Sequence, residues 1–280
     1  MSYINERIKL IVEDHIAQVS LARPEKMNAL DQLMIDAIVQ AGEIIRKDQS
    51  VRVVVLSGEG EHFCAGLDKS NFTALLETSE MSLAPNNSAS ENAKQFKLAD
   101  RTHGVSNIYQ HLVWLWRELP VPVLVAIEGI AFGGGLQIML GGDCRFASSK
   151  SRFSILEMKW GLIPDMGGIQ VMRQLVSDDV IRMLTYSAQE FSAQQAKDWG
   201  FITDIVDDPL EHCLALAKQI TQQNPDAIRV AKKVIEASND LTIEQGLLLE
   251  AQSQDQIVGK PNQIEAVMSQ LQKRLAEFSD

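Results

Sequence analysis

Three consecutive glycines follow a buried strand and constrain the fold more than any other feature of the chain. Residues 121–127 (VPVLVAI) form a continuous apolar run, which is typical of a strand covered on both faces. The glycines stand at 133–135, and the apolar segment 136–140 (LQIML) after them predicts a short buried helix. Glycines let the backbone approach a ligand closely, and the start of a helix presents unpaired N–H groups. The segment therefore predicts an α/β fold with a turn that can bind an oxygen anion.

Other segments support this α/β assignment. Strand patterns are expected at 8–12, 16–21 and 51–56, and a helix capped by Asn28 or Asp31 lies between the last two. Further helices are expected at 105–119 and 192–199, and the last 70 residues read as mainly amphipathic helix. Residues 78–92 are rich in Ser, Asn and Ala, which indicates a surface loop or a lid over a pocket.

Composition excludes several functional classes. The net charge of −11 disfavours binding to nucleic acid or to anionic membrane. Three widely spaced cysteines without a CxxC pattern argue against a disulfide scaffold or structural zinc, and no other cluster has metal-ligand spacing. Since no apolar stretch approaches the roughly 18 residues of a membrane span, we expect a cytoplasmic protein.

A second glycine turn, FCAGLD (63–68), also follows a predicted buried strand. Two such turns could each supply one N–H to the same oxygen, and each donor of such a pair is worth about 3 kcal/mol of transition-state stabilisation. Neither turn matches the Walker or GxGxxG patterns, so a nucleotide phosphate is not the expected ligand.

Five segments in collinear order resemble the crotonase, or enoyl-CoA hydratase/isomerase, family. They are RPEKMNAL (23–30), HFCAGLD (62–68), PVLVAIEGIAFGGGLQ (122–137), LEMKWGLIPDMGG (156–168) and FSAQQAKDWGFITDIV (191–206). The resemblance implies a spiral of ββα units at 1–206 and a helical C-terminal region at 207–280 that packs in homotrimers or hexamers. It also implies an acyl-CoA substrate, with coenzyme A as part of the thioester and no permanently bound cofactor.

The same resemblance assigns binding residues. The backbone N–H groups of Leu67 and Gly134 correspond to the family's oxyanion hole, which stabilises an enolate at the thioester oxygen. Residues expected to contact the substrate or its coenzyme A portion are Arg23, Ala65, Gly66, Asp68, Lys69 and Gly133.

The acid/base positions depart from the hydratase pattern. Hydratases of the family use two glutamates, and here Gln137 stands at the first position and Glu157 at the second. A carboxamide cannot act as a general base, although it can orient a substrate or a water through hydrogen bonds. Asp165, eight residues beyond Glu157, resembles the dienoyl-CoA isomerase branch. Asp165 also suits a turn after Pro164, so a structural role stays open.

These residues favour double-bond isomerisation of an unsaturated acyl-CoA, with Glu157 moving the proton. Hydration of a 2-enoyl-CoA by Glu157 and Asp165 is the alternative within the family. The alternative of another class is a catalytically weak CoA-ester-binding or interaction protein, against which the retained Glu157 argues. His103 could reach the site from the variable segment, although an ordinary surface role is expected for it.

Overall fold

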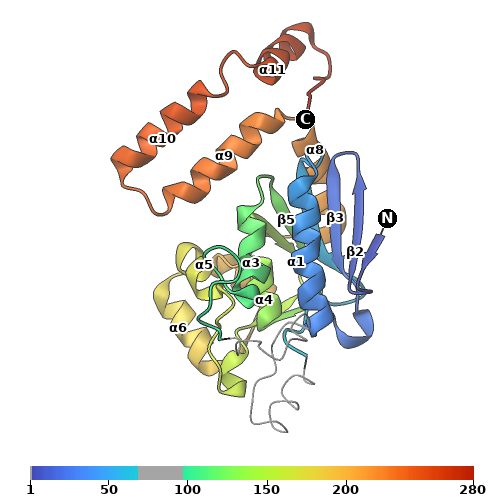
Figure 1. Ribbon diagram of the computed structural model, residues 1–280. Helices are drawn as coiled ribbons and strands as arrows, with labels where there is room; N and C mark the ends of the chain where they lie inside the picture. Colours follow the sequence, from blue (N-terminus) through green and yellow to red (C-terminus); the bar gives the residue numbers. More distant parts are fainter. Residues whose placement is uncertain (1, 69–96) are drawn as a thin grey trace, which may run out of the picture.

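The computed structural model describes residues 2–68 and 97–280 of the 280-residue chain (Figure 1). The segment 78–92, interpreted above as a loop or lid, lies outside the described residues, as does Lys69. Everything below concerns the two described ranges.

The main sheet has seven strands in the spatial order β1-β2-β3-β4-β5-β7-β10 (Figure 1). β1, β2 and β3 pair antiparallel, and from β3 onward the neighbours are parallel. The four predicted strands are confirmed, although those expected at 51–56 and 121–127 each begin two residues later. The strand bounds are Ser2–Ile4, Ile8–Glu13, Ile16–Leu21, Val53–Gly58, Val123–Ile127, Cys144–Ala147 and Asp204–Ile205.

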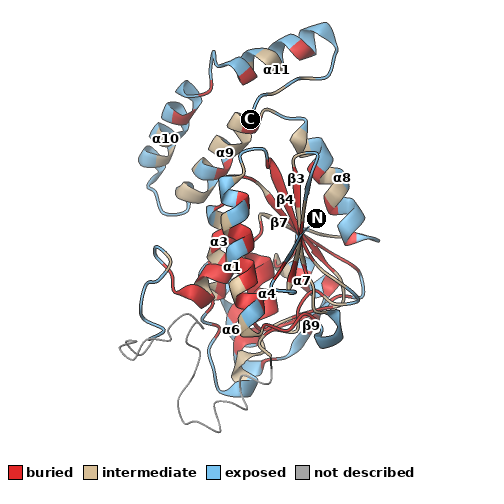
Figure 2. Ribbon diagram, turned by 45° about the vertical axis from the view of Figure 1, so that its right-hand side comes forward, coloured by how far each residue is buried: buried red, intermediate tan, exposed pale blue. Residues whose placement is uncertain are grey.

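Helices cover both faces of this sheet. α1 (Gln32–Lys47) and α3 (Ile108–Glu118) lie on one side, and α8 (Pro209–Thr221) packs on the other (Figure 2). Asp31 caps α1 by accepting a hydrogen bond from the Met34 N–H. α3 starts three residues later than the pattern at 105–119 predicts, because Asn107 and Gln110 form a capping box.

A smaller sheet and a group of short helices complete the core. β6 (Ile130–Phe132) pairs with β8 (Arg152–Ser154), which pairs with β9 (Glu190–Ser192). The apolar helix predicted after the glycines is α4 (Gly134–Leu140), whose residues are all buried. The 3₁₀ helices are η1 (Pro24–Lys26) and η2 (Glu157–Trp160), and the α-helices that follow are α5 (Gly168–Leu175), α6 (Asp178–Ser187) and α7 (Ala193–Trp199).

The last three helices project beyond the sheet. They are α9 (Pro225–Ser238), α10 (Ile243–Asp255) and α11 (Pro261–Gln272), and Figure 1 shows them extending away from the core. The predicted helical C-terminal region is thus confirmed. Its boundary at residue 206 stays a prediction, and α8 packs directly on the sheet through Cys213 and Ala217.

Two buried basic residues attach this projecting region to the core. Lys232 of α9 donates to the carbonyl oxygens of Trp116 and Val121 at 2.9 and 3.0 Å, and to Asp143 at 2.8 Å. Arg52 donates to Asp280 Oδ1 at 2.7 Å and to the Phe278 carbonyl at 2.9 Å. Burial lowers the pKa of Lys232, and the neighbouring Asp143 opposes that shift. Both contacts hold the C-terminal segment against the α/β core.

No helix within the described ranges combines the length and the apolar character that crossing a bilayer requires.

Replacing Lys232 by methionine should destabilise the fold. The change leaves two carbonyl oxygens and the Asp143 carboxylate without their buried donor, which should lower the free energy of unfolding by about 3 kcal/mol. Urea denaturation would measure it, with Lys233→Met as the matched control because Lys233 is exposed. Equal stability of the two variants would contradict the anchoring role of Lys232.

Candidate active site

The first glycine turn is held against the loop that leads into α1. The Leu30 N–H donates to the Gly66 carbonyl at 2.8 Å, and the Asp68 N–H donates to the Leu30 carbonyl at 3.0 Å. These bonds form a parallel bridge between Leu30 and Leu67. In such a bridge the amide of the central residue points to the opposite side. Among the described residues, no group accepts a hydrogen bond from the Leu67 N–H.

The second glycine turn joins β6 to α4. Gly133 has φ 51° and ψ −120°, a backbone conformation that residues other than glycine rarely adopt. Its N–H donates to the Ser154 carbonyl at 2.9 Å. Gly134 is the first residue of α4, so its N–H has no partner within the helix. Within the described part of the chain, no acceptor is found for it elsewhere.

The two turns lie in direct backbone contact. The Cys64 N–H donates to the Ile130 carbonyl, and the Phe132 N–H donates back to the Cys64 carbonyl, both at 3.0 Å. A Cβ atom added to Gly66 would lie 2.6 Å from the Phe132 oxygen and 3.3 Å from the Gly134 nitrogen. A side chain at Gly66 would therefore force the turns apart. The structure brings Leu67 and Gly134 onto adjacent turns, as the sequence predicts for a pair of donors to one oxygen.

Glu157 lies beside the second turn, at the start of η2. A Cβ atom on Gly133 would lie 3.6 Å from Glu157 Oε1. That oxygen accepts a hydrogen bond of 2.6 Å from Gln137 Nε2, and the other oxygen, Oε2, is buried with no donor among the described residues. Burial raises the pKa of Glu157, and the charge of Asp165 raises it further. A carboxyl group in this state can hold and release a proton closer to neutral pH than an exposed glutamate.

Asp165 lies in the loop between η2 and α5. Asp165 is exposed when the whole residue is considered. Its carboxylate group is nevertheless partly surrounded by protein, and this loss of solvent raises its pKa. The two predicted acidic residues are close enough for the charge of Asp165 to raise the pKa of Glu157.

The sequence analysis did not single out Tyr109, a buried residue of α3. Burial raises the pKa of its phenol, and the nearby Asp165 carboxylate raises it further. Tyr109 is therefore close enough to Asp165 for the charge of the carboxylate to act on its phenol group. No motif around residue 109 carries a signal for this proximity, because it arises from the packing of α3 beside the loop before α5.

Gln137 is buried inside the protein, with 1% of its surface exposed. Its Oε1 accepts hydrogen bonds from the N–H groups of Met166 and Gly168, both at 3.0 Å, and its Nε2 donates to Glu157. All three contacts of the carboxamide are with the protein itself. Gln137 thus connects α4, Glu157 and the loop that carries Asp165.

Two of the residues predicted to contact coenzyme A, Arg23 and Ala65, already have polar partners within the protein. Arg23 is 13% exposed and pairs with Asp68 at 2.5 Å and with Asp31 at 3.4 Å. Its charge is therefore balanced inside the protein. The Ala65 N–H is also occupied, donating to the Met27 carbonyl at 2.9 Å. Contact of these residues with coenzyme A stays a prediction.

His103 lies in the loop before α3 and stacks on His111, with ring centroids 4.7 Å apart. Burial lowers the pKa of His111, and the neighbouring His103 lowers it further. This pair gives His103 a packing role in the structure.

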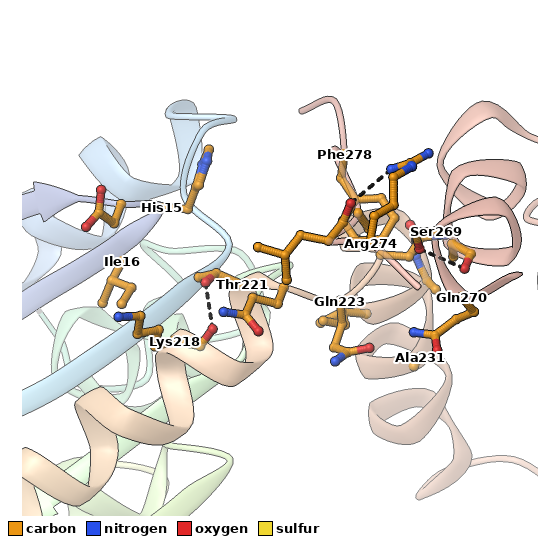
Figure 3. Close-up of a pocket in the computed structure, with 18 residues that line it drawn as sticks. His15, Ile16, Lys218, Thr221, Gln223, Ala231, Ser269, Gln270, Arg274 and Phe278 are labelled. Atoms are coloured by element: carbon orange, nitrogen blue, oxygen red, sulfur yellow. Dashed lines mark hydrogen bonds between the residues drawn. The ribbon is translucent and has the colours of Figure 1, made fainter. Parts of the chain in front are cut away.

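A cavity of about 890 Å³ lies away from these residues, between the β2–β3 turn, the junction of α8 and α9, and α11 (Figure 3). His15, Lys218 and Thr221 line the side formed by the core, and Ser269 and Arg274 line the opposite side. None of the acid/base candidates lines this cavity.

Comparison with known proteins places the chain in a family. The family model for enoyl-CoA hydratase/isomerase matches residues 12–280. The 1,2-epoxyphenylacetyl-CoA isomerase of Escherichia coli K12 is 28% identical over 270 residues, which cover 96% of each chain. The mitochondrial Delta(3,5)-Delta(2,4)-dienoyl-CoA isomerase of Mus musculus is 27% identical, and the match covers 94% of this chain and 78% of the mouse protein.

Solved structures agree with this assignment. The crystal structure of an enoyl-CoA hydratase from Polaromonas sp. JS666 matches with a TM-score of 0.81 and 25% identity, covering 97% of this chain and 99% of the other. The predicted α/β fold of the crotonase type is thereby confirmed. The chain belongs to the enoyl-CoA hydratase/isomerase, or crotonase, family of enzymes acting on CoA esters.

Proposed function

We propose that this enzyme isomerises a double bond of an unsaturated acyl-CoA. The observation that carries the proposal is the buried Oε2 of Glu157, which has no donor in the described ranges and lies beside the turn that presents the Gly134 N–H. The name of one relative, a Delta(3,5)-Delta(2,4)-dienoyl-CoA isomerase, describes a double-bond shift and supports this reaction class.

The N–H groups of Leu67 and Gly134 hold the thioester oxygen. Removal of a proton from the α carbon places negative charge on that oxygen, so two fixed donors stabilise the enolate more than the neutral thioester. The support for this role is the adjacency of the two turns and the lack of other acceptors for either amide in the described ranges.

Glu157 transfers the proton. With a 3-enoyl thioester, the Glu157 carboxylate takes a proton from the α carbon, and the electron pair of that C–H bond spreads over the oxygen and the former double bond. The protonated Glu157 then returns the proton to the γ carbon, which gives the 2-enoyl thioester and restores the carboxylate. Asp165 keeps the pKa of Glu157 raised, or serves as a second acid for a longer conjugated substrate.

Hydration of a 2-enoyl thioester is the second candidate. It requires groups on either side of an attacking water, a task that Glu157 and Asp165 could share. The neighbouring pair, Glu157 and Gln137, contains one carboxyl group and one amide, which argues for isomerisation.

The substrate class can be tested with 2-enoyl, 3-enoyl and 3,5-dienoyl thioesters of coenzyme A in heavy water. We expect a product with a shifted double bond, unchanged in composition except for deuterium, because the proton passes through an exchangeable carboxyl group. Mass spectrometry of the thioesters would measure it. A product heavier by one water, formed from the 2-enoyl substrate, would instead identify a hydratase. Binding of all three without turnover would favour a CoA-ester-binding role.

Glu157→Gln should lower kcat/KM by about 10²–10⁴-fold on whichever thioester is turned over, because the proton carrier is lost. Glu211→Gln on the exposed surface of α8 is the matched control and should leave kcat/KM unchanged. Full activity of Glu157→Gln would overturn the proposed mechanism.

We also propose that the projecting helices pack against further copies of the chain in a homotrimer or hexamer. Large apolar side chains on α10 and α11 are exposed, among them Ile243 at 84%, Leu247 at 61% and Leu271 at 74%. An exposed apolar surface of this kind marks a protein interface.

Light scattering during gel filtration should give three or six times the monomer mass. The double substitution Leu247→Glu and Leu248→Glu should shift the mass toward the monomer, because charged groups replace apolar contacts. Gln252→Glu, on the exposed surface of the same helix, is the control. A monomeric wild-type protein would contradict this assembly.

A further inference from the structure

Gln137 takes no part in the proton transfer proposed above, but its carboxamide is hydrogen-bonded to Glu157 and to the loop after Asp165. Building on the proposed function, we propose that Gln137 is a positioning residue that fixes the Glu157 carboxyl group and the Asp165 loop in one arrangement. In that arrangement Oε2 of Glu157 is the atom that exchanges the proton with the substrate.

The orientation of the Gln137 amide follows from its partners. Two backbone N–H groups, those of Met166 and Gly168, point at one end of the amide at 3.0 Å, so that end is the oxygen. The NH₂ end must then face Glu157 Oε1, 2.6 Å away. The reversed amide would set donors against donors and an oxygen against a carboxylate oxygen. The orientation is therefore set by the protein around it.

This orientation makes the two oxygens of Glu157 unequal. Oε1 accepts an N–H bond and is a poor site for a proton, since a proton there would face the NH₂ group. Oε2 is buried and has no donor among the described residues. A proton on Glu157 therefore resides on Oε2.

The same side chain holds the loop that carries Asp165. Of its two backbone donors, Met166 follows Asp165 directly in the chain and Gly168 stands three residues after it. A Cβ atom at Gly168 would lie 2.7 Å from Gln137 Cγ and Oε1, so the glycine allows the loop to close on the amide. From its buried position on α4, Gln137 thus fixes how far apart the carboxyl groups of Glu157 and Asp165 lie.

An amide at this position also leaves Glu157 free to ionise. A carboxylate at residue 137 could keep the bonds to Met166 and Gly168 through one oxygen. Its second oxygen would take the place of Nε2 and would lie 2.6 Å from Glu157 Oε1, with no proton between them. Two carboxylates so close share one proton, because both cannot be ionised together. The other charged group acting on Glu157 in the described ranges is Asp165.

The experiment is a pH titration of ¹³C-labelled glutamate carboxyl groups by NMR in the full-length protein. The Glu157 signal is assigned by its loss in Glu157→Gln. In Gln137→Glu we expect the apparent pKa of Glu157 to rise by about one pH unit or more, as in other strongly coupled carboxyl pairs. The pH at which kcat/KM falls on the acidic side of its profile should rise together with this pKa. KM should change little, because the loop keeps its hydrogen bonds.

Gln170→Glu is the matched control, since it adds the same charge at an exposed position on α5. It should leave the Glu157 titration unchanged. Should Gln137→Glu not fold, Gln137→Met serves instead: the lost N–H donor should also raise the Glu157 pKa, and the freed loop should raise KM.

An unchanged Glu157 titration in the Gln137 variants would overturn the positioning role, whether or not the enzyme turns over a tested thioester. A shifted titration together with a fully active Glu157→Gln would have a different meaning. Gln137 would still position Glu157, and the proposed proton transfer would be wrong.

Discussion

The contact between two backbone turns is the constraint on which the rest of the site depends. Cys64 exchanges hydrogen bonds with the β6 strand, and glycine at 66 and 135 removes the Cβ atoms that would meet the opposite backbone at 2.6 Å or less. Because the turns touch, Leu67 and Gly134 lie on adjacent turns, and Glu157 at the start of η2 lies beside the second turn. The parallel strands β4 and β5, paired in the main sheet, bring these turns to the same edge.

The chemistry around these turns is controlled by burial more than by ion pairs. Glu157 and Asp165 have raised pKa values chiefly because the protein removes solvent from them. Arg23, which contacts the first turn through Asp68, is already balanced by Asp68 and Asp31. Burial of this kind lets a carboxyl group hold and release its proton closer to neutral pH. In the proposed mechanism, the amides of Leu67 and Gly134 stabilise the negative charge that develops on the thioester oxygen.

The sequence predicts the elements that local chemistry determines, such as the β-branched strands, a helix cap at Asn28 or Asp31, and the short helix after three glycines. It also identifies the family through five collinear segments. It cannot predict contacts made by folding alone. Met166 and Gly168 reach Gln137 from 29 and 31 residues away, and Tyr109 comes near Asp165 only through the packing of α3. The roles of the site residues depend on such long-range contacts.

In the proposed mechanism, the backbone amides of Leu67 and Gly134 polarise the carbonyl group of a thioester. Isotope-edited infrared spectroscopy tests it directly, using an unsaturated thioester of coenzyme A with a ¹³C-labelled carbonyl bound to the Glu157→Gln variant. Two hydrogen bonds from the protein weaken the C=O bond, so we expect a carbonyl band at lower wavenumber than that of the free thioester in water. A bound thioester whose band stays at the free position would contradict it.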